Sequence, residues 1–428
     1  MTGQMAAPTA QRLESLDFLR GTALFGILLM NIVGMGLGPA YNNPTVAGGA
    51  EGIDLWAWIV ASVGFEGTQR ALFSILFGAG VILFTSRAEA SGRPDAADLY
   101  FRRNLWLIAF GLVNAWVLLF VGDILYYYGI TALFLYAFRN LPGRKLLAIG
   151  SATLLLAAAW GAIDAVGVLK VHEQYRAASA VPEASRTAEQ KEAVEAWRAK
   201  EREGNPGPEG FAQIRAGVTA SYGSALTSYA PIITHFQSWN LYRYFFDIFG
   251  VMMIGMALFK LGVLTLEVRR RVYLSMIVIG YAIGLTCNIL EVRWLIANNF
   301  SPLAYAQVEV SYDVGRIATT MGHLGALMLF LRSGLLGWLR RSMAAVGRMA
   351  LTNYLTHSLV ALTVFVLLGW FGYLQRHQLY FIVLAVWAFQ IVVSPLWLRH
   401  FHFGPVEWLW RYLTYGKPPP FRRGSPAS

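Results

Sequence analysis

Two side chains that could do chemistry stand eleven residues apart in the first apolar segment, within the stretch DFLRGTALFGILLMN. On an ideal helix, Asn31 lies within roughly 20° of Arg20 and about 16 Å further along the axis, so one face carries both groups. Asp17, three residues before Arg20, is expected to pair with it. A guanidinium can hold a phosphate with two hydrogen bonds, and an amide can donate to a developing oxyanion. The alternative for Asn31 is a hydrogen bond between helices.

Other ionisable groups lie in or beside apolar segments, where their desolvation is costly and function is the first hypothesis. Two oppositely charged pairs, Glu66 with Arg70 and Arg243 with Asp247, have the four-residue spacing of neighbours on a helix. Both pairings have a purely structural alternative. Asp123 precedes an apolar run, and its alternative role is a helix N-cap. We predict an additional polar pocket from Glu66, Gln69, Arg70, Ser74, Asp123, Asp247, Arg316 and Asn353.

Two histidines within apolar segments are candidates for a general base. His323 shares a helical face with Arg316 and Thr320, and His357 follows Asn353 by one turn. Imidazole is the side chain that ordinarily titrates near neutral pH, so either could accept a proton from a substrate. An isolated buried histidine is more often only hydrogen-bonded. The predicted catalytic set is therefore Asn31, His323 and His357, with Asp17 and Arg20 binding a donor.

Several kinds of chemistry find no support in the sequence. HExxH, CxxC, GxSxG and P-loop motifs are absent, and the one cysteine, Cys287, lies within an apolar run. Zinc proteolysis, hydrolase chemistry of the nucleophile-elbow type and nucleotide hydrolysis are therefore unsupported. We expect no metal. The net charge of +11 comes mostly from Lys and Arg in short connecting segments, which indicates membrane orientation and no nucleic-acid partner.

The elements that must position these residues are membrane-spanning helices. The chain has 428 residues, of which 56% are hydrophobic and 14% charged, with a mean hydropathy of +0.48. A soluble globule of this size needs more polar surface. Since roughly twenty apolar residues cross a bilayer, we predict an all-α polytopic bundle of about ten spans, over residues 18–37, 66–86, 103–121, 124–138, 145–166, 243–262, 272–295, 315–333, 346–369 and 378–398.

Alternate connections are rich in Lys and Arg, whereas residues 38–54, 121–123 and 297–312 contain neither. Both termini are therefore predicted to be cytoplasmic. The predicted organisation is an N-terminal membrane half (1–166), an extracytoplasmic polar segment (167–240) and a C-terminal membrane half with a cytoplasmic tail (241–428). Within the polar segment, AEQKEAVEAWRAKEREG indicates a solvated helix that ends near Gly204. GIDLWAWIVASV is expected to lie in the outer interface, and the stretch 403–417 in the cytoplasmic one.

Several stretches together carry a resemblance to a known family: LDFLRGTALFGILLMNI, ALFSILFGAG with GDILYYYG, and GRMALTNYL with FGPVEWLWRYLTYGK. The chain resembles the YeiB-like bacterial membrane proteins, whose C-terminal half is a domain of unknown function. The resemblance covers nearly the whole chain. It implies a multi-pass protein of the bacterial plasma (inner) membrane.

The resemblance extends to a wider group of transmembrane acyltransferases. Many O-acetyltransferases of that group have an Arg followed eleven residues later by a His, where this chain has Arg20 and Asn31. The heparan glucosaminide N-acetyltransferase is more similar, with Asn at that place and a His eleven residues further on, where this chain has Asn42. The resemblance thus implies acyl transfer with a base supplied from elsewhere, for which His323 and His357 are the candidates.

The resulting hypothesis is a membrane acyltransferase that uses acyl-CoA as co-substrate. An acyl group, such as acetyl, passes from a cytoplasmic donor near Arg20 to an acceptor at the outer side. The acceptor is left open among a saccharide, a lipid and a secondary metabolite. Membrane lipids are expected partners, and homo-oligomerisation stays open. The alternatives are a small-molecule transporter or exporter with no bond chemistry, and an assembly scaffold in which the polar groups only join helices.

Overall fold

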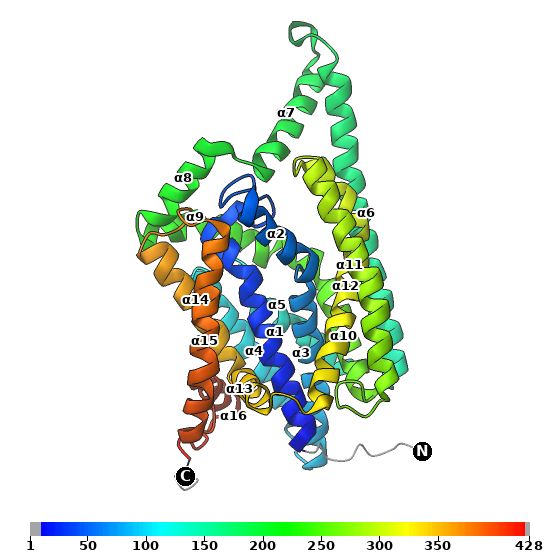
Figure 1. Cartoon of the computed structure of the whole chain (residues 1–428), viewed down its shortest axis with the longest axis vertical. Helices are drawn as coiled ribbons and strands as arrows, with labels where there is room; N and C mark the ends of the chain where they lie inside the picture. The colour runs from blue at the N-terminus through cyan, green and yellow to red at the C-terminus, as the bar shows by residue number, and fades with distance from the viewer. Residues whose placement is uncertain (1–9, 424–428) are drawn as a thin grey trace.

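The protein is a bundle of helices packed against one another. A computed structural model describes residues 10–423, with side chains from Glu14 onward, and every regular element in that range is a helix (Figure 1). The helices are α1 (Ala10–Leu37), α2 (Gly52–Gly64), α3 (Thr68–Ala90), α4 (Ala96–Trp116), α5 (Leu125–Leu135), α6 (Gly143–Ser179), α7 (Ala188–Gly204), α8 (Gly207–Thr219), α9 (Tyr222–Gln237), α10 (Trp239–Lys260), α11 (Arg270–Ala297), α12 (Pro302–Ser333), α13 (Gly337–Arg348), α14 (Ala350–Ala361), α15 (Arg376–His400) and α16 (Pro405–Tyr415).

The bundle confirms the prediction of a polytopic membrane protein. Eight stretches of the described residues are long and apolar enough to cross a bilayer. Each of the ten predicted ranges overlaps a helix. The two that fall outside the eight are α4, whose hydropathy is lowered by Arg102, Arg103 and Asn104, and α5, which is short and continues as a 3₁₀ turn over Tyr136–Phe138.

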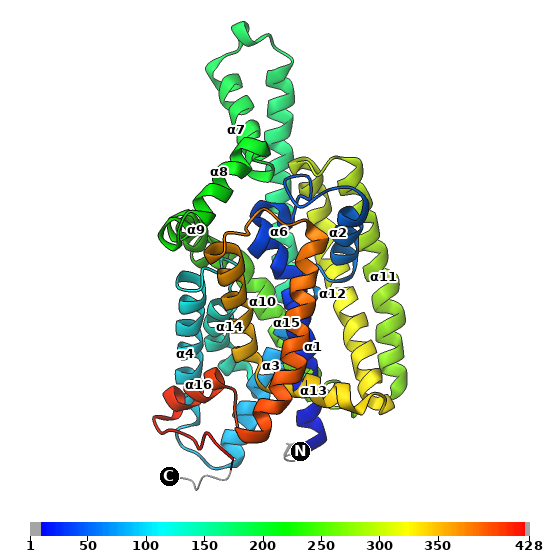
Figure 2. The same ribbon diagram turned by 60° about the vertical axis from the view of Figure 1, so that its left-hand side comes forward.

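One end of the bundle carries much of the basic charge. The start of α1, the short helix α13 and the helix α16 all lie at the lower end in two views (Figures 1 and 2). Arg340 and Arg341 belong to α13, and Arg411 belongs to α16. We call this the basic end, and the opposite end, toward which α7 projects, the far end.

The predicted polar segment is helical throughout most of its length. The solvated helix is confirmed as α7, which starts with a capping box between Thr187 and Gln190 and ends at Gly204. It packs against the extension of α6, where the ring centroids of Trp197 and His172 lie 4.6 Å apart. The helices α8 and α9 follow and lie over the far end of the bundle (Figure 2).

Two predicted spans begin later than their apolar runs suggest. The second span starts at Thr68, because Gly67 adopts a left-handed conformation (φ 65°) that ends the preceding turn. A Cβ at Gly67 would lie 2.4 Å from the Tyr312 hydroxyl and 2.3 Å from Arg316 Cδ, so the chain needs glycine here. The ninth span starts at Ala350 and its last turns are a π-helix over Leu362–Leu367.

Helices α3 and α10 approach so closely that glycine is required at their contact. A Cβ at Gly78 would lie 2.0 Å from the carbonyl oxygen of Met252, and one at Gly255 would lie 2.1 Å from that of Ile75. Backbone atoms cannot rotate away as side chains can. This close approach holds Arg70 of α3 beside Asp247 of α10.

Substitution of Gly78 by leucine is therefore expected to lower the free energy of unfolding by about 3 kcal/mol, at the upper end of the usual cost of overpacking. Thermal unfolding in one detergent, followed by tryptophan fluorescence, measures the change. Gly167→Leu on α6 is the matched control, because nothing lies within 4 Å of a Cβ there. Equal stabilities of the two variants would contradict the close approach.

Candidate functional site

A basic cavity of about 580 Å³ opens among α1, α3, α4, α13 and α16. Six arginines line it: Arg20, Arg87, Arg93, Arg103, Arg348 and Arg411. Aromatic side chains, among them Trp410 and Tyr415, share the lining. The predicted pairing of Asp17 with Arg20 is confirmed at 2.9 Å, and both residues face this cavity.

The charge in the basic cavity is not balanced by its own acids. Arg93 pairs with Asp95, but Arg87, Arg348 and Arg411 have no carboxylate within ion-pair distance among residues 14–423. The one other carboxylate in the lining, that of Glu407, is taken up by the N-terminus of α14.

Glu407 accepts hydrogen bonds from the backbone N–H groups of Leu351 and Thr352 and from the Thr352 hydroxyl. Burial raises the pKa of Glu407, and the hydrogen bonds from Thr352 oppose that rise. Because this carboxylate is committed to the helix terminus, the basic cavity keeps an excess of positive charge, and its guanidinium groups are donors of the kind that anions accept.

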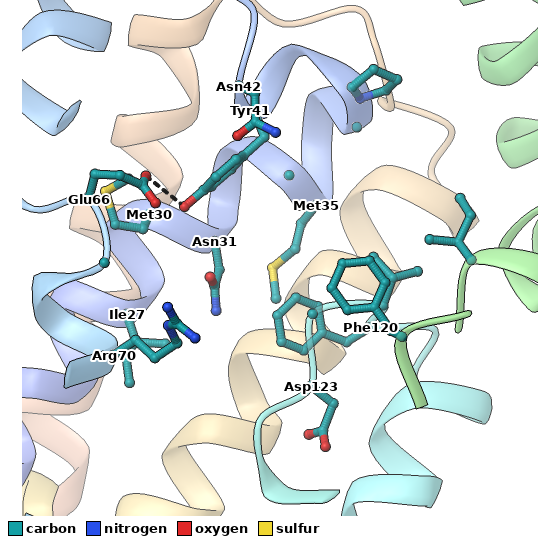
Figure 3. A pocket seen from close by; sticks show the side chains of 18 of the residues that line it. Ile27, Met30, Asn31, Met35, Tyr41, Asn42, Glu66, Arg70, Phe120 and Asp123 are labelled. Atoms are coloured by element: carbon teal, nitrogen blue, oxygen red, sulfur yellow. Dashed lines mark hydrogen bonds between the residues drawn. The ribbon is translucent and has the colours of Figure 1, made fainter. Parts of the chain in front are cut away.

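A far cavity of about 1000 Å³ opens from the other end. Asn31, Glu66, Gln69, Arg70, Asp123 and Arg316 of the predicted set all line it. Figure 3 shows Asn31 and Arg70 projecting toward one open space, with Asp123 on the side away from Tyr41. The side chain of Asn31 makes no hydrogen bond within the part of the chain that the structure describes, so its amide is free to meet a ligand.

The two cavities meet at the start of α5. Ile124 and Tyr127 line the far cavity, whereas their chain neighbours Leu125 and Tyr128 line the basic one. Tyr354 of α14 closes the basic cavity on the same side, and its hydroxyl accepts a hydrogen bond from the Ile124 N–H at 3.2 Å. One turn of chain, which we call the partition (residues 123–128), therefore separates the two.

Asp123 is held firmly within the partition. Its carboxylate accepts hydrogen bonds from the Asn114 amide at 2.7 Å and from the Tyr126 N–H at 2.9 Å. The contact with Tyr126 is the capping contact predicted from the sequence. Asp123 still lines the far cavity, so one carboxylate both builds the partition and faces the open space.

A buried ionic network supports one wall of the far cavity. Asp247 lies between Arg70, at 3.3 Å, and Arg316, which also pairs with Asp313. Arg316 is 2% exposed and Asp247 is 6% exposed. Because each charge has a partner, the network can persist in a site of low dielectric constant.

Two of the ion pairs expected from spacing are wrong. Glu66 does not pair with Arg70, since the break at Gly67 takes it off the helix, and it instead accepts a hydrogen bond from the Tyr41 hydroxyl at 2.9 Å (Figure 3). Arg243 does not pair with Asp247 but with Asp164 and Glu309, on α6 and α12. Contacts between helices override the local four-residue spacing in both cases.

Neither predicted histidine is among the residues that line the two cavities. Both ring nitrogens of His323 are engaged, Nδ1 with the Tyr281 hydroxyl at 2.9 Å and Nε2 with the Gly64 carbonyl at 2.7 Å. His357 is 2% exposed, with Nε2 at 3.2 Å from Gln390. The geometry thus favours a packing role for both, and it gives neither a path to a substrate.

Three further residues of the predicted pocket lie behind its walls. Ser74 bonds to the Tyr128 hydroxyl at 2.6 Å, and Asn353 donates to the Val346 carbonyl and to Ser394. Asp247 acts through its arginines, as described above. These side chains position the lining and do not belong to it.

Sequence reasoning missed residues that the structure brings into the two sites. Arg348 and Tyr354 stand in the stretch GRMALTNYL, and Trp410 and Arg411 in FGPVEWLWRYLTYGK, but neither stretch was expected to form a cavity. The motif resemblance itself was the signal, because every stretch that carries it contributes to the basic cavity or the partition.

The chain was compared with known proteins. Residues 258–417 match the family model described as "Protein of unknown function (DUF418)". The chain is 30% identical over 408 residues to the "Uncharacterized protein YeiB" of Escherichia coli (strain K12). The aligned region covers 94% of this chain and 96% of that protein. It is 29% identical over 427 residues to the "Uncharacterized protein YxaH" of Bacillus subtilis (strain 168), with 95% of each covered. No solved structure matches significantly. Since the likeness to YeiB extends over nearly the full length of both chains, the protein belongs to the YeiB family.

Proposed function

We propose that this protein transfers an acyl group from acyl-CoA, bound in the basic cavity, to an acceptor in the far cavity. The observation that carries the proposal is the meeting of two cavities from opposite ends at one thin partition. The basic end is assigned to the cytoplasm, since Lys and Arg concentrate there. The inner bacterial membrane is the proposed location.

The donor side suits a polyanion joined to a long neutral arm. Coenzyme A carries phosphate groups at one end, which unpaired arginines can hold with bidentate hydrogen bonds. Trp410 and Tyr415 offer aromatic faces beside those arginines. Leu125 and Tyr354 belong to the lining of this cavity, so a thioester at the end of the arm would meet the partition there.

The acceptor side supplies the groups that acyl transfer needs. An acceptor hydroxyl attacks the thioester carbonyl carbon and gives its proton to Asp123. The C–O bond forms, the C–S bond breaks, and the electron pair leaves with sulfur, which is released as the thiol once protonated. The free amide of Asn31 donates to the oxyanion that develops on the carbonyl oxygen. Asp123 replaces the histidines as the proposed base because it faces the cavity.

Acetyl-CoA is expected to bind the purified protein saturably in calorimetry. Arg348→Ala should weaken binding at least about tenfold, since a charged hydrogen bond contributes roughly 1.5–3 kcal/mol. Arg341→Ala is the matched control: it removes the same charge from the same helix, but Arg341 does not line the cavity. Added salt should weaken binding, and pantetheine, which lacks the phosphates, should bind poorly.

The proposal fails if folded protein binds no acyl-CoA, or if Arg341→Ala weakens binding as much as Arg348→Ala. Absence of binding would favour the transporter alternative, in which the same polar groups line a substrate path. Binding without release of thiol from acetyl-CoA in lipid vesicles that contain acceptors would also contradict acyl transfer.

A further inference from the structure

The residues that line the far cavity fall into two groups by the helices that carry them, which we call its polar arm and its apolar arm. One arm lies against the starts of α3 and α12 and the end of α11, and its polar residues include Glu66, Glu291, Glu309 and Tyr312. The other lies between α8, α9 and the α14 region, and it is mostly apolar, with Ile214, Val218, Ile232, Leu362 and Val366. The partition and Asn31 lie along the same cavity. Such a lining fits a molecule with a polar head and an apolar tail.

The apolar arm reaches the surface of the protein. Ile232 of α9 lines the cavity and is also 44% exposed. The segments that contact α9 carry further exposed apolar side chains, among them Val117 at the end of α4 and Leu367 of the π-helical turns. The α14 region is a π-helix here, over Leu362–Leu367, a distortion that occurs often at functional sites. An apolar chain can therefore reach this arm along an apolar surface.

The charges of the polar arm disfavour an anionic head group. Glu66, Glu291 and Asp123 line the cavity without an arginine or lysine in ion-pair distance, in the portion of the chain from residue 14 to 423. The two arginines in the lining, Arg70 and Arg316, are already neutralised by Asp247 and Asp313. Carboxylates and tyrosines accept hydrogen bonds from hydroxyl groups, and tyrosine faces pack against sugar rings.

We propose that the acceptor is a membrane lipid with a hydroxyl-rich, uncharged head group, such as a neutral glycolipid. Its tail lies in the apolar arm and its head in the polar arm, so that a head-group hydroxyl lies beside Asp123 and Asn31. The role of this lipid as the acyl acceptor rests on the proposed function. Its binding site depends on the far cavity alone. Lipid binding can therefore be tested without acyl transfer.

The probe is a monoglucosyl diacylglycerol with a fluorescent acyl chain, titrated against the purified protein in detergent micelles. Saturable binding is expected, with competition by unlabelled glycolipid and little competition by phosphatidylglycerol. Ile232→Trp fills the apolar arm and should weaken binding at least tenfold. The larger side chain is expected to leave the fold intact, because Ile232 is partly exposed. Glu291→Gln, in the polar arm, should weaken binding severalfold.

Val278→Trp on α11 is the matched control, because Val278 is 66% exposed and lies outside the cavity lining. It should bind the glycolipid like the wild type, and binding of acetyl-CoA at the basic cavity should be unchanged in all three variants. Preference for methyl glucoside over the glycolipid would overturn the lipid assignment, and equal binding of phosphatidylglycerol would overturn the head-group assignment. If the glycolipid binds but acetyl-CoA does not, the proposed function fails and the lipid site stands.

Discussion

Asp123→Asn is expected to lower the rate of acyl transfer by about 10²–10⁴-fold, the range over which a positioned general base contributes. The substitution keeps the shape of the side chain and removes the group that accepts the proton. Because Asp123 lines the far cavity and not the basic one, the dissociation constant of acetyl-CoA should stay within about twofold of the wild type. Thiol release from acetyl-CoA in acceptor-containing vesicles and calorimetry measure the two quantities.

Asp98→Asn is the control for this experiment, since Asp98 is an exposed carboxylate of α4 that pairs with Arg102 at the surface. Its rate should match that of the wild type. Asn31→Ala should lower the rate by about 10²–10³-fold, as the loss of one oxyanion donor does. Full activity in Asp123→Asn, with the protein folded and acetyl-CoA bound, would remove Asp123 as the base and return attention to His357.

Asp247→Asn is expected to lower the free energy of unfolding by about 3–5 kcal/mol, because it leaves the buried Arg316 and the half-buried Arg70 without their shared partner. Arg70 of α3 and Arg316 of α12 converge on this one carboxylate of α10, so its loss affects three helices at once. Thermal unfolding in detergent, followed by tryptophan fluorescence, measures the effect. The far cavity should also lose affinity for its ligands, since Arg70 and Arg316 line its wall.

Asp95→Asn is the matched control, because the pair of Asp95 with Arg93 lies at the surface and its loss should change stability little. The double variant Asp247→Asn, Arg316→Met should be less destabilised than the sum of its single variants, since it removes the unpaired charge together with its partner. Additive losses would show that the two side chains do not interact energetically.

The membrane architecture follows from local properties of the chain. Apolar runs of the right length predicted the eight stretches that are long and apolar enough to cross a bilayer, while two further predicted spans, α4 and α5, fall outside them. The basic connections predicted that one end of the bundle would be basic. The pairing of Asp17 with Arg20 and the bounds of α7 are set within one or two turns of chain. Such features depend on periodicity, hydropathy and capping, which neighbouring residues determine by themselves.

Only part of the candidate site could be predicted from such local features of the sequence. The sequence identified Asn31, Arg20 and Asp123 as candidate site residues, but it predicted one continuous path. The structure instead has two cavities separated by the partition. It also nominated His323 and His357 on residue type alone, and the structure packs both outside the cavity linings. Residue type indicates what a side chain can do, whereas access depends on the walls built by other helices.

The sequence by itself thus determined a multi-pass helical bundle, its basic end and the polar groups available within it. Only the tertiary structure decided that Ile124 meets Tyr354 across 230 positions of chain, that Asp247 holds Arg70 and Arg316, and that Glu66 turns to Tyr41. The physical reason is that spacing along a helix selects partners only when no nearer group from another helix competes. In a tightly packed membrane bundle, such groups are present on every side.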